Sequence, residues 1–593
     1  MRFTKWSYFS ILFVLIFSIA AVKIYRWNGH SGNDWQTIID GDGKGYYNYL
    51  PAIFIYQNIS YAQEGTHGII KTQNGTYNKY TIGESLLLAP FFGAACLTAK
   101  IGGYKIDGFS EPFQKWTSVA ALFYLCLGLF ALRKLLLNFG LDDRNIALVI
   151  IVWGMGSNLL YYSVIEPLMS HVFSFSIISC FLFSLSEFFK SFKNKFLFLS
   201  VFFLSLVILI RPINAVSILL IPFFIPTDKR TKEIILSKIK TIQSQIIIAG
   251  VFIFLISLQC FSWHLQTGKI FLWSYSKEGF YFLHPQFWNV LFSFKKGLLI
   301  YTPAVFISSF GLIVLFKKNR KEFFWVSIYL FVCIYLISAW WNWYFGDSFG
   351  HRAFIDFYSV FALLMAILLS SVKNQMVKIS ISLACFFCIF LNIFQSWQYH
   401  ENIIHPYDMN WEKYKYVFLK TDDVYKDVIG GQDELPPYSK KPLTLFYSTI
   451  NDYEKEYSGW STGKKETDGQ NSFCAYEGEF NTVFSIPLDS FVNVEEQVFI
   501  SASLNRYEPK INNSQKTLFV IDIRDEKKQV YYYTFPVNEL PVEKPNEWRT
   551  WNYRITIPDL ALKNCTLKIY IWNREQKKFF IDNFKLDFYK TAE

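Results

Sequence analysis

Long runs of apolar residues constrain the fold of this chain more than any other feature. Crossing the roughly 30 Å hydrocarbon core of a bilayer takes about 20 apolar residues in a helix. Only 18% of the residues are charged, against about 25% in soluble proteins, which excludes an ordinary soluble enzyme. The sequence therefore predicts a polytopic α-helical membrane protein. About eleven spans are expected, near residues 7–23, 116–138, 146–164, 171–189, 196–210, 213–226, 244–262, 298–316, 323–341, 353–371 and 378–396.

The charged residues are distributed unevenly along the chain. From Trp397 onward there are 25 basic and 30 acidic residues, whereas the 396 residues before it hold 33 basic and 17 acidic ones. Positive charge gathered in short loops between apolar runs is typical of membrane topology. We therefore expect membrane lipids as partners and no nucleic acid.

One further apolar run, residues 85–99, is only about 15 residues long and contains Pro90. If it does not cross the membrane, the basic loops share one side with the N-terminus, as the positive-inside bias requires. We therefore predict an interfacial or re-entrant helix there. The protein is then expected in the cytoplasmic (inner) membrane. Its N-terminus lies on the cytoplasmic side, and its C-terminal domain is periplasmic.

The tail of the chain has a different pattern. Beyond about residue 440, short runs of alternating polarity are separated by turn signals, which predicts an extracytoplasmic β-sandwich of jelly-roll type. The expected domains are a membrane part at 1–396, a linker at 397–439 and the sandwich at 440–593. Cys474 and Cys565 are the only cysteines of the sandwich, and an oxidising compartment permits a disulfide between them.

The first outer loop, at 24–115, is expected to carry juxtamembrane helices and begins with an acidic, glycine-rich stretch. Asp40 and Asp42 alternate with glycines and are followed by Lys44 and Tyr46. Most stretches of this kind are flexible, solvated turns, and a calcium site needs more oxygen ligands at EF-hand spacing. The alternative, that the two carboxylates serve a reaction at the membrane interface, depends on their context.

That context resembles the GT-C class of glycosyltransferases, which includes protein O-mannosyltransferases and lipid A aminoarabinose transferases. The shared features are an acidic residue soon after the first span, a long outer loop and many further spans, together with the segments 166–171 and 340–356. The Asp-Glu pair of the O-mannosyltransferases is replaced here by Asp40-Gly41-Asp42. The donor sugar and a requirement for a divalent metal ion are therefore left open, and no cofactor is assigned.

The resemblance implies transfer of a sugar from a polyprenyl-phosphate donor to a lipid, protein or polysaccharide acceptor. Such a reaction requires a base for the acceptor hydroxyl and cations for the departing phosphate. Asp42 is the expected base, with Asp40 as the second choice, and Arg352 and Arg211 are the expected phosphate ligands. Asp42 is expected to lie about one sugar ring away from these arginines, because a carboxylate repels a phosphate.

Further residues are expected to contact substrate. A histidine at the membrane edge is a candidate metal ligand or proton relay, although most such histidines are merely hydrogen-bonded. Aromatic residues there stack on sugars or belong to the interfacial belt. The candidate substrate-binding residues are Lys44, Tyr46, Tyr80, Glu166, His171, Trp341 and Trp343.

Two other classes of function are compatible with the sequence. A transporter or flippase for a lipid-linked saccharide is typically built from internal repeats with charges in mid-membrane. No repeat is visible, and Arg211 is the nearest candidate for such a charge. A non-catalytic glycan-assembly protein would instead present the tail as a sugar-binding module.

Overall fold

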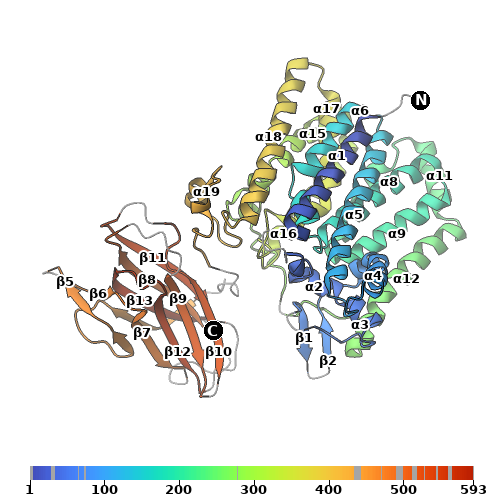
Figure 1. Cartoon of the computed structure of the whole chain (residues 1–593). Helices are drawn as coiled ribbons and strands as arrows, with labels where there is room; N and C mark the ends of the chain where they lie inside the picture. The colour runs from blue at the N-terminus through green and yellow to red at the C-terminus, as the bar shows by residue number, and fades with distance from the viewer. Residues whose placement is uncertain are drawn as a thin grey trace. The chain divides into compact units, whose positions relative to one another are not determined.

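The computed structural model describes residues 5–28, 34–63, 66–72, 75–276, 278–432, 443–468, 471–488, 498–510, 517–526, 528–541, 545–557 and 564–591. The chain divides into two compact units (Figure 1). The helical unit comprises Met1–Phe345 and Phe349–Ser396, and the β unit comprises Gly346–Ser348 and Trp397–Glu593.

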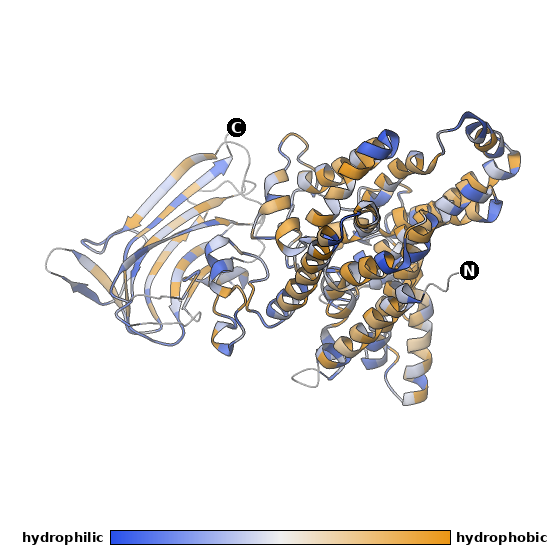
Figure 2. Ribbon diagram, turned by 90° about the horizontal axis from the view of Figure 1, so that it is seen from above, coloured by the Kyte–Doolittle hydropathy of each residue, from blue (hydrophilic) through white to orange (hydrophobic). Residues whose placement is uncertain are grey.

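The helical unit confirms the predicted membrane class. In the described part of the chain, eight helices are long and apolar enough to cross a membrane, and two shorter apolar helices accompany them. Figure 2 shows apolar residues along most of the length of these helices. The main helices are α1 (Trp6–Val22), α4 (Gly83–Gly102), α5 (Glu111–Asn138), α6 (Asp143–Met155), α7 (Leu159–Val164), α8 (His171–Ser191), α9 (Asn194–Ile210), α10 (Ile221–Phe224), α11 (Lys229–Ile239), α12 (Ile242–Thr267), α15 (Ala304–Lys318), α16 (Arg320–Ala339), α17 (Tyr358–Ser371) and α18 (Gln375–His400).

Several expected spans are interrupted for local reasons. Pro212 has no N–H to continue α9, so Arg211 is extended and the 3-10 helix η3 (Pro212–Leu220) follows. Pro303 likewise separates α14 (Leu298–Tyr301) from α15. The broken pair expected around Arg211 is therefore confirmed, whereas the run expected at 298–316 is divided where a single helix was expected.

The short apolar run that was expected not to span lies within α4, which has 20 residues and is long enough to cross. The start of α4 and the loop that follows it both contact residues 46–47. Ser85 donates to the carbonyl oxygen of Tyr46, and the hydroxyl of Tyr47 donates to that of Gly108 at 2.6 Å. Because the chain enters and leaves α4 beside the same short segment, α4 and α5 begin at one end of the unit. Whether α4 crosses the membrane, and on which side the loops lie, both stay predictions.

The core of the helical unit is formed by α5, α8 and α17. The Tyr124 and Phe173 rings of α5 and α8 lie 5.1 Å apart, and the hydroxyls of Ser179 and Ser359 join α8 to α17 at 2.6 Å. Small hydroxyl-bearing residues let helices approach closely while their polar atoms stay paired. The 3-10 helix η4 (Arg352–Phe357) leads directly into α17. It therefore places its first residues at one end of this core.

The β unit is a sandwich, as predicted. Two antiparallel sheets have the strand orders β10-β9-β12-β7-β4 and β11-β8-β13-β6-β5, and β3 also pairs with β13. Apolar and polar residues alternate along the strands (Figure 2), and the apolar ones of both sheets form one buried core. The strands are β3 (Leu443–Asn451), β4 (Trp460–Thr462), β5 (Lys465–Thr467), β6 (Ser472–Tyr476), β7 (Phe480–Pro487), β8 (Phe499–Tyr507), β9 (Thr517–Arg524), β10 (Gln529–Pro536), β11 (Trp548–Thr556), β12 (Thr566–Asn573) and β13 (Phe579–Thr591).

The expected linker at 397–439 is, as far as it is described, part of the β unit. It contains helix α19 (Trp411–Val417), whose fully buried Lys413 forms ion pairs with Asp408 at 3.1 Å and Glu539 at 3.4 Å. The backbone N–H of Gly430 also donates to the carbonyl oxygen of Glu539. This segment is therefore folded against the sandwich.

The two cysteines of the sandwich are not joined. Cys474 and Cys565 are both buried as free thiols, and the Thr482 hydroxyl donates to the Cys474 sulfur at 3.4 Å. Both behave as small core residues.

These contacts predict where the β unit can be cut. A fragment of residues 397–593 should unfold at a clearly higher temperature than one of residues 440–593. The shorter fragment lacks Lys413 and leaves Glu539 without its ion pair. Thermal unfolding followed by circular dichroism at 215 nm measures the difference. Equal melting temperatures would contradict the assignment of 397–432 to the folded unit.

Candidate active site

The acidic, glycine-rich stretch forms a short helix, α2 (Gly41–Tyr47), and is not the flexible turn expected from its composition. A Cβ atom on Gly43 would lie 2.6 Å from the carbonyl oxygen of Leu168, and one on Gly45 would lie 2.3 Å from the Tyr80 ring. Side chains at these two positions have no room. The glycines therefore bring Asp42 into contact with segments that are distant in sequence.

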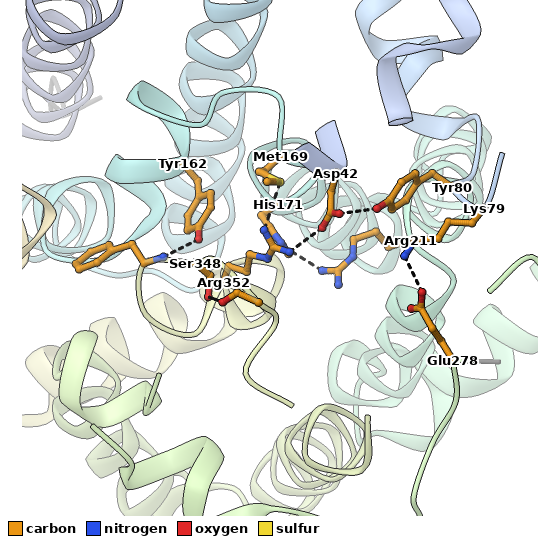
Figure 3. Close-up of polar contacts among 12 residues, drawn as sticks. Asp42, Lys79, Tyr80, Tyr162, Met169, His171, Arg211, Glu278, Ser348 and Arg352 are labelled. Carbon is orange, nitrogen blue, oxygen red and sulfur yellow. Dashed lines mark hydrogen bonds and ion pairs between the residues drawn. The ribbon is translucent and has the colours of Figure 1, made fainter. Parts of the chain in front are cut away.

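Asp42 is held by two partners (Figure 3). Arg352 Nη2 donates to Asp42 Oδ2 at 2.7 Å, and the Tyr80 hydroxyl donates to Asp42 Oδ1 at 2.5 Å. Burial favours the neutral acid, but the Arg352 charge and the Tyr80 hydrogen bond outweigh it and lower the pKa of Asp42. Burial and the Asp42 charge both raise the pKa of Tyr80, which keeps its proton. Asp42 is thus a carboxylate, and 38% of its side chain remains accessible.

Arg352 begins η4, and its side chain is only 9% exposed. Besides its ion pair with Asp42, it donates through Nη1 to the sulfur of Met169 at 3.5 Å. Its Nε has no hydrogen-bond partner in the described part of the chain. The expected separation of Asp42 from the arginines by one sugar ring is therefore wrong for Arg352, because the two side chains are in direct contact.

A second buried ion pair lies beside the first. Asp356 is fully buried and accepts from Arg211 Nη1 at 2.8 Å and from His171 Nδ1 at 2.9 Å. A carboxylate accepts only, so the ring nitrogen facing it is the donor. Arg211 Nη1 also lies 3.0 Å from His171 Nδ1, as Figure 3 shows. His171 is accordingly a hydrogen-bonded residue of this cluster.

Asp356 was not selected by the sequence analysis. It lies four residues after Arg352 in the same short helix, and this spacing is the signal that could have found it. The segment around it was noted only for its resemblance to other proteins. Two arginines each paired with a carboxylate give the site a balanced charge without a bound ligand.

Lys79 and Glu278, which lie in the region around Asp42, were also missed. Lys79 forms an ion pair with Glu278 at 2.8 Å, and its amine lies over the rings of Tyr80 and Tyr275. Burial opposes this charge, but Glu278 more than compensates and raises the pKa of Lys79. The stretch around Glu278 has no motif that would have pointed to it.

Glu84, at the start of α4, is also part of this region. It is fully buried, and neither of its carboxylate oxygens has a hydrogen-bond partner in the described part of the chain. Arg211 is the charged group that acts on it.

The structure brings some predicted residues together and leaves others aside. Asp42, Tyr80, Arg352, His171 and Arg211 form one group (Figure 3), and the Tyr46 ring packs 4.5 Å from that of Tyr80. Of the remaining predicted residues, Asp40 is exposed, and the Lys44 amine lies 5.7 Å from the centre of the Phe109 ring. The Glu166 charge acts on Arg352. Trp341 Nε1 donates to Glu278 at 3.3 Å, and Trp343 packs on Tyr344.

No group of three or more His, Cys, Asp or Glu side chains that could hold a metal ion occurs among the described residues. The donor set present at Asp42 consists of one carboxylate, an arginine and a tyrosine. Arg352 and Tyr80 are the hydrogen-bond donors, which suit an anion, and the Asp42 carboxylate is the group that can accept a proton.

Comparison with known proteins gives structural matches only. No protein-family model and no curated protein matches the chain. The oligosaccharyltransferase AglB of Archaeoglobus fulgidus, solved with an inhibitory peptide and a dolichol-phosphate, matches over 74% of this chain and 62% of its own, with 11% identity and a TM-score of 0.42. The arabinosyltransferase EmbB of Mycobacterium smegmatis matches over 98% and 64%, with 11% identity and a TM-score of 0.34.

Both proteins are membrane glycosyltransferases of the GT-C fold, the class that the sequence resembles. The chain spans less than two thirds of the length of either. A family 22 carbohydrate-binding module of Clostridium thermocellum also matches, over 25% of this chain and 94% of its own, with 16% identity and a TM-score of 0.17. Such low similarity does not transfer an activity, so function must be argued from the site.

The buried cluster predicts a large effect on stability. Replacing Asp356 with Asn leaves Arg211 without its counter-charge, and breaking a buried ion pair typically costs about 3–5 kcal/mol. Asp40→Asn, an exposed change of the same chemistry, should cost less than about 0.5 kcal/mol. Thermal unfolding of the purified protein in detergent measures both. Identical melting temperatures for the two variants would contradict the structural role of Asp356.

Proposed function

We propose that this protein is an inverting glycosyltransferase that uses a polyprenyl-phosphate-linked sugar. The observation that supports it best is the gathering of Asp42, Arg352 and Arg211, from three distant stretches of sequence, at one site. His171 and Arg352 each stand at the start of a helix long and apolar enough to cross a bilayer, so a lipid-bound phosphate would have both a hydrophobic surface and cationic partners there. The acceptor is a lipid, a protein or a polysaccharide on the outer face of the cytoplasmic membrane.

Donor binding would rearrange the ion pair at Asp42. A phosphate competes with a carboxylate for a guanidinium, and Arg352 still has Nε to offer as a second donor. The phosphate would take the place of Asp42 on Arg352, with Arg211 as its second cation. Asp42, still bonded to Tyr80, is then free to accept a proton.

The chemical step is a single displacement. The acceptor oxygen attacks the anomeric carbon from the side opposite the phosphate, and its proton passes to Asp42. The bond between that carbon and the phosphate oxygen breaks, and its electron pair leaves with the polyprenyl phosphate. One displacement inverts the anomeric configuration. The arginines stabilise the charge that develops on the leaving group.

Substitution of the two central residues should separate chemistry from binding. Asp42→Asn should lower turnover by about 10²–10⁴-fold, the usual contribution of a general base, and leave donor binding intact. Arg352→Lys should weaken donor use, because lysine keeps the charge but lacks the planar fork. Turnover is measured with a radiolabelled polyprenyl-phosphate sugar in membranes. Mass spectrometry of lipid-linked sugars and surface glycans in a deletion strain identifies the donor.

Two variants serve as controls for this experiment. Glu233→Gln, an exposed change on α11, should leave expression and turnover unchanged. Asp40→Asn should retain turnover if Asp42 is the base. Full activity of Asp42→Asn would refute the mechanism, and movement of an intact lipid-linked sugar without transfer would favour the flippase instead.

A second candidate function belongs to the β unit, where we propose a saccharide-binding surface. Tyr532 of β10, Tyr570 of β12 and Phe480 of β7 lie on one sheet, in which β12 pairs with β7 and β9 lies between β10 and β12. The Phe480 and Tyr570 rings lie 5.6 Å apart, and Tyr532 and Phe480 are exposed. Beside them, Asp522 accepts from Arg524 and Gln529 at 2.8 Å each. Aromatic faces beside polar groups suit a sugar, which has apolar faces and hydroxyl edges.

This surface can be tested on the purified full-length protein. Tyr532→Ala and Tyr570→Ala should each abolish binding to the oligosaccharides of a glycan array, because each variant lacks one of the rings on which a sugar would stack. Trp548→Ala, an equally exposed aromatic of the other sheet, is the matched control and should bind normally. Binding unchanged in all three variants would exclude this surface.

A further inference from the structure

The segment between α12 and α14, residues 268–297, has two chemically different faces. One face is polar and contacts the neighbourhood of Asp42. The Ser274 hydroxyl donates to the carbonyl oxygen of Lys79 at 2.7 Å, and Glu278 pairs with the Lys79 amine. Lys79 directly precedes Tyr80, the partner of Asp42. This face therefore forms one side of the site.

The same segment is fastened to the end of α16. Tyr281 N donates to the carbonyl oxygen of Ala339 at 2.6 Å, and Gln286 N donates to that of Ser338 at 2.7 Å. The backbone N–H of Trp341 donates to the carbonyl oxygen of Gly279 at 3.0 Å. Backbone bonds of this kind hold the segment in a defined position.

The opposite face is strongly apolar and exposed. Leu283 is 90% exposed, Phe271 77% and Trp288 74%, and Ile270, Trp273 and Phe282 are exposed as well. An exposed cluster of this size is rare on a surface that meets only water. Tryptophan beside aliphatic and phenylalanine residues is instead typical of the membrane interface.

This apolar face continues onto a predicted span. Helix α13 (Phe287–Phe292) packs against α16, where the Phe287 and Phe331 rings lie 6.3 Å apart. Phe331 belongs to a helix long and apolar enough to cross the membrane and is itself 61% exposed. The Tyr335 hydroxyl of α16 also donates to the carbonyl oxygen of Phe282 at 3.0 Å. The surface expected to face lipid on α16 thus extends over the segment.

We propose that the exposed apolar side chains of residues 270–276 and 279–288 insert into the bilayer and contact phospholipid of the leaflet next to the Asp42 site. The segment then separates the lipid on its apolar face from Lys79 on its polar face. It lets the membrane lie directly beside the polar site without exposing the Lys79–Glu278 pair to hydrocarbon. This inference concerns the membrane contact alone and holds whatever reaction the site performs.

Photochemical crosslinking in native membranes tests the contact. A benzophenone amino acid placed at Leu283 should yield covalent phospholipid adducts on irradiation, detected by mass spectrometry of the purified protein. The yield should match that of the same probe at Phe331. It should exceed several-fold the yield at Leu445, an exposed apolar residue of β3 in the β unit.

Two results would overturn the proposal. A yield at Leu283 no higher than at Leu445, with Phe331 labelled, would place the segment in water. Adducts at Leu283 with polyprenyl lipid but not with phospholipid would assign the surface to the tail of a bound lipid. A second probe at Trp288 guards against a local effect of the first and should behave like Leu283.

Discussion

The ion pair between Asp42 and Arg352 joins two parts of the helical unit that are 310 residues apart in sequence. A charge held in a mostly buried setting is stable only if an opposite charge and hydrogen bonds compensate for lost hydration. Asp42 obtains both, from Arg352 and from Tyr80. Helix α2, the residues just before α4 and the start of η4 are thereby fixed relative to one another. The remainder of the site is arranged around this pair.

The second pair repeats this arrangement with different elements. Asp356 connects Arg211, at the end of α9, with His171, at the start of α8. Each residue lies where a helix begins or ends, and such places carry unpaired backbone groups and admit irregular structure. Two arginines are therefore presented together although no single element bears both. Without a ligand, each is neutralised by its own carboxylate, and an incoming anion must displace one of them.

The position of the site also explains the mixed character of its surroundings. The donor that we propose, a lipid-linked phosphate, would need an apolar path for its chain next to a polar site for its head group. Segment 268–297 supplies a boundary of this kind, because its polar face meets Lys79 while its apolar face is exposed.

The sequence alone determined the class of the protein, because spans of apolar residues and strands of alternating polarity are local patterns. It also named Asp42, Arg352, Arg211, Tyr80 and His171, since charges and histidines beside spans are few. Only the tertiary structure revealed that Asp42 touches Arg352, that the glycines around it are packing sites, and that Asp356, Lys79 and Glu278 belong to the same region. These relations join residues up to 310 positions apart. Local patterns carry no information about which distant chain segments meet, because that is decided by how the helices pack.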